Sequence, residues 1–423
     1  MNLGGNSVDT HRHLARLFVL ALGGSDPVVD KFYTPRWSII PDLGIDLIGP
    51  PLLQVLPVHV AGRVLIGLVL LLPVLGAVAY SQALLGRRSW WSLGCGLVAY
   101  HQTFMLGFLN FTAGMGLALL LAAVWLRDRE LHPRRTVVLT ALGCVGLYLC
   151  HLMGVVFLGI LIAAHELAWL SQSYRSHLIT PRALLIRFSA AASAFVVPLA
   201  FYAGSALSRE AGRLTYLTAQ GKLAQLVVPW TNYLLPLDIA TACATVGAIG
   251  FLLVRRQMQI PRQAAIAFML LGVLYLACPF AYAGVANVDM RFVVLAGFML
   301  FAGLAPVRVP TWLASVMVGL FLVRMGVVAM AWLAIDRRGV APTLVGSPLS
   351  QISRSNCSHW LAPQLGQGRK NRRRSEARYS RSIRERPAMV GVETRKALRR
   401  HPKVRARASA RAIGSPSPST SPG

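Results

Sequence analysis

The chain has 423 residues, of which 55% are hydrophobic and only 14% are charged. This balance is too apolar for a soluble chain of such length, so a soluble enzyme is excluded. The net charge of +28 is unevenly spread, because eighteen of the 43 Lys and Arg lie beyond position 350. The composition therefore indicates a protein that crosses a membrane several times and carries a basic tail.

Residues 1–58 come first and hold five of the fifteen carboxylates. Residues 13–21 place their apolar side chains on one helical face, but this stretch is too short and too charged to span, so it should lie in the membrane interface. A second interfacial helix is expected over 43–55, with Pro50-Pro51 and Pro57 ending it. We predict that residues 1–58 form a segment with amphipathic helices held against one face of the membrane.

Residues 59–335 are nearly continuous apolar sequence and predict an all-α, polytopic transmembrane helical bundle. A span needs about 20 residues, and six stretches are suited to one crossing each: 59–84, 188–207, 231–254, 263–285, 291–306 and 311–335. Two stretches, 89–126 and 136–170, are too long for a single crossing. Each is predicted to be a helical hairpin, turning near Gly107–Asn110 and near Cys150–Gly154, which gives about ten spans.

Basic residues predict the orientation, because short loops rich in Lys and Arg stay in the cytoplasm. The hairpin arrangement gathers thirteen arginines on one side: Arg87, Arg88, Arg127, Arg129, Arg134, Arg135, Arg175, Arg182, Arg187, Arg255, Arg256, Arg262 and Arg308. Only five basic residues fall on the other side: Arg63, Arg209, Arg213, Lys222 and Arg291. Residues 1–58 are therefore expected to be extracytoplasmic, in the cytoplasmic (inner) membrane of a bacterium.

Both ends of the sequence are unusual for such a protein. An extracytoplasmic segment with neither a signal peptide nor an anchor ahead of it suggests a missing helix upstream of Met1. Residues 345–423 are rich in Arg, Ser, Pro and Gly and predict a basic disordered tail. This tail resembles out-of-frame translation, and on the outer side it would meet no nucleic acid, so we assign it no function and expect no nucleic acid partner.

Two charged residues lie deep within predicted spans. Arg324 is about 20 Å from the inner side and Asp238 about 10 Å from the outer side, so their depths coincide in a core about 30 Å thick. We predict that the two side chains pair with one another, or that Arg324 contacts a lipid phosphate. Snorkelling of Arg324 to the interface is the competing interpretation. Glu166 is expected about one turn from a helix end, within reach of the interface.

Further polar residues are predicted near the outer ends of the spans. His101 and His151 both approach the outer turns of their hairpins, where they could face one site or, individually, serve as packing residues. Asp289 and Arg291 lie two residues apart in a short outer loop. They could line the mouth of a cavity or form a simple loop ion pair.

A set of short motifs carries a family resemblance. They are, in order, Asp9-x-x-x-His13-Leu14-Ala15-Arg16, Phe32-Tyr33, Trp37, Pro41-Asp42-Leu43-x-x-Asp46, Gly107-Phe108-Leu109-Asn110-Phe111 and Cys150-His151-Leu152. With these motifs, residues 9–335 resemble a group of uncharacterised bacterial multispanning proteins, which are similar to the GT-C class of membrane glycosyltransferases.

The resemblance implies a GT-C-like enzyme that moves a sugar from a polyprenyl-phosphate donor to an acceptor on the extracytoplasmic side. By position, Asp9 matches the catalytic acid/base, with His13 beside it. Before His13 this chain has Arg12, where the motif has a small polar residue. The candidates for substrate or phosphate binding are Arg16, His101, His151, Asp289, Arg291 and Arg324.

Other interpretations of the sequence stay open. Proline-interrupted spans suit a lipid groove, but they suit a transporter or flippase equally. A non-catalytic, degenerate membrane protein is the third alternative. No protein metal site is predicted, although a divalent cation could meet the charge of the leaving phosphate. The sugar, the acceptor and the oligomeric state are left undetermined.

Overall fold

The computed structural model describes residues 15–23, 27–35, 37–175, 180–205, 208, 212, 214–282 and 285–335. All of them belong to the unit that spans Met1–Ala341, which is followed by a second unit, Pro342–Gly423. The predicted tail over 345–423 lies outside the described residues. So do the two catalytic candidates, Asp9 and His13.

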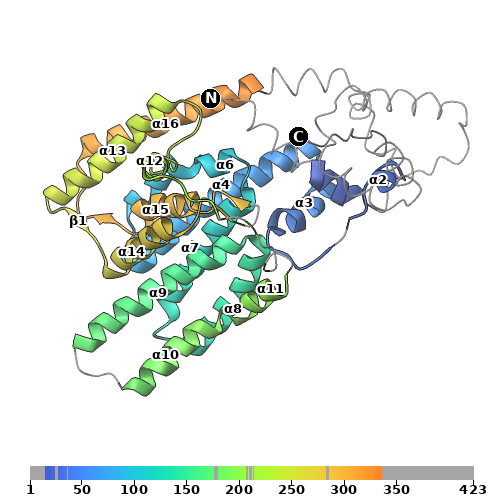
Figure 1. Ribbon diagram of the computed structural model, residues 1–423. Coiled ribbons are helices and arrows are strands. Elements are labelled where there is room, and N and C mark those ends of the chain that lie inside the picture. Colours follow the sequence, from blue (N-terminus) through green and yellow to red (C-terminus); the bar gives the residue numbers. More distant parts are fainter. Residues whose placement is uncertain are drawn as a thin grey trace, which may run out of the picture. The chain divides into compact units, whose positions relative to one another are not determined.

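The described part of the chain is mostly helical, with almost no sheet (Figure 1). Residues 15–22 are helical. The labelled helices are α2 (Pro27–Phe32), α3 (Gly44–Val55), α4 (Val58–Leu85), the 3-10 helix η1 (Trp90–Cys95), α5 (Gly96–Ala99), α6 (Gln102–Met105), α7 (Leu109–Asp128), α8 (Pro133–Cys150), α9 (Leu152–Arg175), α10 (Pro181–Ser193), α11 (Val196–Gly204), α12 (Ala219–Gln225), α13 (Leu235–Val254), α14 (Arg262–Ala277), α15 (Met290–Ala302) and α16 (Thr311–Ile335). Two short antiparallel ribbons pair β1 (Met258–Gln259) with β4 (Ala305–Pro306) and β2 (Ala281–Tyr282) with β3 (Val285–Ala286).

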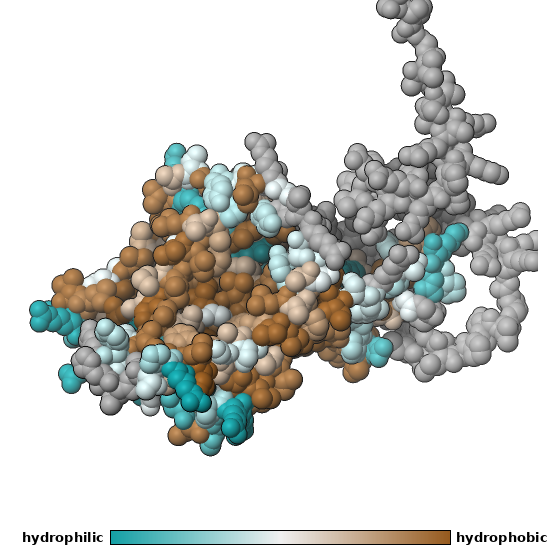
Figure 2. All heavy atoms as spheres, turned by 60° about the horizontal axis from the view of Figure 1, so that its bottom comes forward, coloured by the Kyte–Doolittle hydropathy of each residue, from teal (hydrophilic) through white to brown (hydrophobic). Residues whose placement is uncertain are grey.

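Five of these helices, α4, α7, α9, α13 and α16, are long and apolar enough to cross a membrane. A sixth span results if α10 and α11, which are bent by 49° relative to one another, are taken together. Brown, hydrophobic side chains cover much of the visible face of the described residues (Figure 2). The predicted helical, multi-pass membrane character is therefore confirmed. The count of about ten spans stays a prediction, since α14 and α15 are shorter apolar helices.

The two predicted helical hairpins differ in regularity. The second has a single break, at His151, between α8 and α9, close to the predicted turn. In the first, residues 90–105 form three short helices before the chain turns at Gly107, whose φ of +86° lies in the left-handed region that favours glycine. Only the returning arm of the first hairpin, α7, is a long continuous helix.

Close contact between α4 and α7 forms the centre of the bundle. A Cβ on Gly116 of α7 would lie 2.5 Å from the backbone of Leu72 and Pro73 in α4. In the other direction, a Cβ on Gly76 would lie 2.5 Å from the carbonyl oxygen of Gly116. Helices in membranes use such small residues to bring their backbones together. These glycines therefore set the distance between the two helices.

The first segment packs against the bundle through a smaller apolar cluster. Leu17 is buried with Ile45 of α3, Leu65 of α4 and Leu109 of α7. Helix α3 continues through Pro50 and Pro51 to Val55, so the prediction that this pair interrupts it was wrong. Proline fixes φ near the helical value, and here it removes hydrogen bonds without ending the helix. The cluster fixes α3 next to the start of α4 and α7.

Candidate functional site

Residues 42–45, at the start of α3, are held against the start of α7 and the end of α8, mainly by the buried side-chain amide of Asn110. The Oδ1 atom of Asn110 accepts a hydrogen bond from the Ile45 backbone N–H at 2.8 Å. Its Nδ2 donates to the Asp42 carbonyl oxygen at 2.9 Å. The Leu43 N–H adds a bond to the carbonyl oxygen of Leu149 at 2.7 Å. Together these bonds fix the backbone of residues 42–45.

Asp42 has an unusual backbone in this fixed segment. Its φ of +84° lies in the left-handed region, which costs free energy for a residue with a Cβ and recurs at functional sites. The side chain of Asp42 is 63% exposed, and its Oδ1 lies 4.0 Å from Nε2 of His151. Arg291 also interacts electrostatically with this carboxylate. Asp42, Asn110, His151 and Arg291 are called the Asp42 site below.

The tautomer of His151 follows from its hydrogen bonds. Its Nδ1 accepts from the Met153 backbone N–H at 3.0 Å, so a neutral ring carries its proton on Nε2, the atom that faces Asp42. Burial, reinforced by the nearby Arg291 charge, lowers the pKa of His151 to about 3. The imidazole is therefore neutral at pH 7 and offers one N–H donor at the site.

His101 is near the Asp42 site but has a capping role. It is fully buried, and its Nδ1 accepts from the Phe104 backbone N–H at 3.1 Å at the start of α6. The hydroxyl of Thr103 donates to the same nitrogen at 2.5 Å. The rings of His101 and His151 both pack edge-on against Phe111, with centroids 6.2 and 5.6 Å from it. The two predicted histidines thus meet at one aromatic ring.

Asp289 and Arg291 take part in different contacts. The buried Asp289 carboxylate accepts from Nζ of Lys222 at 2.7 Å and from Nε2 of Gln225 at 3.2 Å. It thereby holds α12 against the start of α15. The guanidinium of Arg291 instead lies 5.1 Å from the ring centroid of Phe108, and its charge interacts with that of Asp42. Asp289 is therefore paired with Lys222, and Arg291 belongs to the Asp42 site.

Arg16, the described member of the first motif, lies beside α3. Its Nη2 is 2.5 Å from Oδ2 of Asp46, whose side chain is only 5% exposed. A shallow hollow next to this ion pair is also lined by Trp37, Ser38 and Leu43. Arg16 therefore neutralises a buried carboxylate of the first segment.

The two deep charges predicted to pair do lie in contact. Nη1 of Arg324 is 2.7 Å from Oδ1 of Asp238, and both side chains are 1% exposed. Nη2 of Arg324 donates to the Trp230 carbonyl oxygen at 2.7 Å, and Oδ2 of Asp238 accepts from the Asn232 N–H at 2.8 Å. The pair links α13 to α16, and the snorkelling alternative does not hold for this buried guanidinium.

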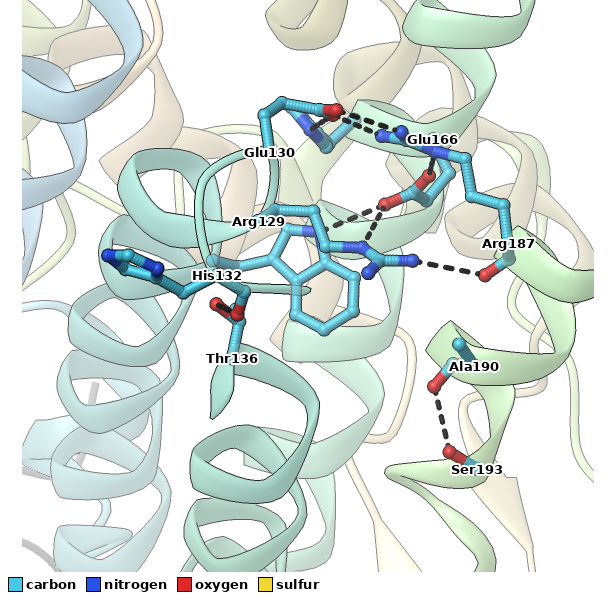
Figure 3. Close-up of polar contacts among 10 residues, drawn as sticks. Arg129, Glu130, His132, Thr136, Glu166, Arg187, Ala190 and Ser193 are labelled. Carbon is cyan, nitrogen blue, oxygen red and sulfur yellow. Dashed lines mark hydrogen bonds and ion pairs between the residues drawn. The ribbon is translucent and has the colours of Figure 1, made fainter. Parts of the chain in front are cut away.

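Sequence reasoning missed a buried ion network at the opposite end of α7 (Figure 3). Glu166 of α9 accepts from Nε1 of Trp125 at 3.1 Å, from Nε of Arg129 at 3.4 Å and from Nε of Arg187 in α10. Arg187 also pairs with Glu130 at 2.5 Å. The prediction that Glu166 lies about one turn from a helix end was wrong, because α9 extends to Arg175, and the side chain of Glu166 is only 1% exposed. The network ties α7, α9 and α10 together.

Within the described residues, no group of three or more His, Cys, Asp or Glu could hold a metal ion. Comparison with known proteins adds no assignment, since no protein family, curated protein or solved structure matches the chain. The function must therefore be argued from the geometry of the Asp42 site.

Proposed function

We propose that the protein is a GT-C-like membrane glycosyltransferase with its reaction centre at the Asp42 site. The supporting observation is the exposed Asp42 carboxylate, held on a strained backbone 4.0 Å from Nε2 of His151 and interacting electrostatically with Arg291. The motif resemblance implies such an acidic residue in the first outer loop. It favoured Asp9, whereas the geometry of the described residues supports Asp42 in the same segment.

The proposed chemistry needs a base and a site for a leaving anion. An acceptor hydroxyl gives its proton to the Asp42 carboxylate as its oxygen bonds to the anomeric carbon of the sugar. The bond between that carbon and the phosphate oxygen breaks, and the polyprenyl phosphate leaves with the electron pair. Arg291 and the Nε2–H of His151 are suited to stabilise the negative charge that develops on the phosphate. Every group required lies at one end of the bundle.

The proposed location follows from the arginine distribution. We place the Asp42 site on the extracytoplasmic face of a bacterial inner membrane, where polyprenyl-phosphate sugars are donors for the GT-C class. The exposed apolar side chains of Phe32, Trp37 and Ile39 in the first segment suit a position at the lipid surface, where such a donor is held.

The experiment compares matched variants of the full chain. Membranes that contain the wild type, Asp42→Asn or Asp30→Asn are supplied with a panel of polyprenyl-phosphate-linked hexoses, and sugar transfer is measured. Asp42→Asn should lower the rate at least about a hundredfold, because a general base contributes about that much or more. Asp30→Asn, an equal change of charge in the same segment, should retain activity. Full activity of Asp42→Asn would refute this assignment of the base.

A transporter or flippase is the second candidate function. It is favoured by the buried Arg324–Asp238 pair, which joins α13 and α16. Most of each of these two helices lies at the outside of the protein, since only 33% of the α13 span and 17% of the α16 span are buried. The bend between α10 and α11 is a further feature that such proteins use. Movement of a labelled lipid across proteoliposomes without chemical change would favour this candidate.

A further inference from the structure

A cluster of arginines lies at the end of α4 opposite the Asp42 site, around the short ribbon of β1 and β4. The strands pair Met258 with Pro306 and Gln259 with Ala305. Arg87, just after α4, reaches this ribbon and donates to Oε1 of Gln259 at 3.3 Å and to the Pro306 carbonyl oxygen at 3.4 Å. The ribbon thus gathers the end of α4, the end of α13, the start of α14 and the segment before α16.

Six exposed arginines come together on these segments, and they are called the ribbon arginines: Arg87, Arg88, Arg255, Arg256, Arg262 and Arg308. The stretches 81–90, 250–262 and 303–313 contain no Asp or Glu. Among the described residues, none of the ion pairs involves a ribbon arginine. By contrast, Arg129 and Arg187 are neutralised by Glu166 and Glu130. The ribbon arginines therefore form a concentrated positive surface that is paired with no carboxylate of the described residues.

Exposed apolar side chains accompany these charges. Trp90 is 87% exposed, Trp312 is 55% exposed and Val254 is 83% exposed. Tryptophan is enriched where a membrane meets water, and α13 and α16, which lead away from the ribbon, are largely exposed apolar spans. A soluble anion would contact the arginines alone. A membrane lipid could contact the arginines with its headgroup and the tryptophans and helices with its glycerol and acyl chains.

We infer that the ribbon arginines bind the headgroup phosphates of anionic phospholipids in the adjoining leaflet. The guanidinium group matches phosphate geometry through paired N–H donors and is more weakly hydrated than an ammonium. Clusters of about four to eight basic residues next to a membrane helix are typical of sites that bind anionic lipids, and the ribbon arginines fall within that range. This inference is independent of the proposed enzymatic function, because the ribbon arginines and the Asp42 site lie at opposite ends of α4.

The test uses the purified full chain in detergent, titrated with phosphatidylglycerol or phosphatidylcholine and analysed by native mass spectrometry. The triple variant Arg88→Gln/Arg255→Gln/Arg308→Gln leaves Arg87, which holds the ribbon, unchanged. A matched triple variant, Arg134→Gln/Arg135→Gln/Arg182→Gln, removes three exposed charges from the starts of α8 and α10. Thermal unfolding of both variants serves as the check on folding.

The wild type should bind phosphatidylglycerol more tightly than phosphatidylcholine. The ribbon triple variant should weaken phosphatidylglycerol binding about tenfold or more, because each basic residue near an anionic surface adds to the attraction. The matched triple variant should bind as the wild type does. Equal weakening in both triple variants, equal binding of the two lipids, or displacement of the lipid by millimolar inorganic pyrophosphate would overturn the inference.

Discussion

Nη1 of Arg324 lies 2.7 Å from Oδ1 of Asp238, and this buried ion pair joins α16 to α13. A buried pair is weak evidence of net stabilisation, because removing both charges from water is costly. Breaking it is nevertheless expensive, since the remaining charge is left without a partner in an apolar surrounding. The pair is therefore a determinant of how these two helices associate.

This contact gives the first prediction. Arg324→Met and Asp238→Leu should each lower the free energy of unfolding by about 3 kcal/mol, because each leaves one uncompensated charge. The double variant should recover most of that loss, since neither charge remains. Unfolding in mixed detergent micelles measures all three. A double variant as unstable as either single variant would show that the two side chains do not depend on one another.

A second prediction concerns the anchor of the Asp42 site. Asn110→Leu removes both the acceptor for the Ile45 N–H and the donor to the Asp42 carbonyl oxygen, and should cost about 2 kcal/mol by leaving buried groups unpaired. Hydrogen exchange of residues 42–46 should accelerate. Thr112→Val, two residues further along the chain, is the matched control, because its hydroxyl donates only to the Phe108 carbonyl oxygen at the start of the same helix. Equal acceleration in the control would mean that Asn110 is not the specific anchor.

The Glu166 network allows a comparison within one cluster. Glu166→Gln should lower the free energy of unfolding by about 3 kcal/mol, because two arginines then lose their buried carboxylate. Glu130→Gln removes an equal charge from a side chain that is 56% exposed, and its effect should be within about 1 kcal/mol. Thermal unfolding of the two variants measures the difference. Similar effects would contradict the assignment of Glu166 as the centre of the network.

The same cluster predicts a dependence on pH. A hydrogen bond from Arg187 holds the pKa of Glu130 below its ordinary value of 4.5. A lowered pKa in the folded state means that this carboxylate stabilises the protein above pH 4.5, and that the contribution is lost as the pH falls through the lowered pKa. The difference in Tm between the wild type and Glu130→Gln should therefore shrink on acidification. A difference that grows at lower pH would contradict it.

The sequence was most informative where hydrophobic length decides the structure. Helices such as α4, α13 and α16 match the predicted spans within a few residues, because crossing a membrane requires a long apolar run. The pairing of Arg324 with Asp238 could be predicted for the same reason, because the ends of the two apolar runs set the depth of each residue in the membrane. The break of residues 90–105 into short helices was not predicted. It includes the cap that His101 forms at the start of α6, and the left-handed Gly107 follows it.

The candidate site was harder to predict from the sequence. Asp42 was noticed in a motif, but its left-handed backbone depends on Asn110, 68 residues away in the chain. The contact of Asp42 with His151 depends on the end of α8 and the start of α9 meeting α3. Such long-range contacts leave no periodic signal in the sequence. The motif-based choice of Asp9 lies outside the described residues and stays a prediction.

The account of function depends most on which side of the membrane the Asp42 site faces. Ser38→Cys places an exposed thiol in the first segment near Asp46, and His132→Cys places one just beyond the far end of α7. Each variant is treated with a membrane-impermeant maleimide before and after permeabilisation of the cells. The account predicts that position 38 is labelled in intact cells and that position 132 is labelled only after permeabilisation. The reverse result would place the Asp42 site in the cytoplasm and contradict transfer on the extracytoplasmic side.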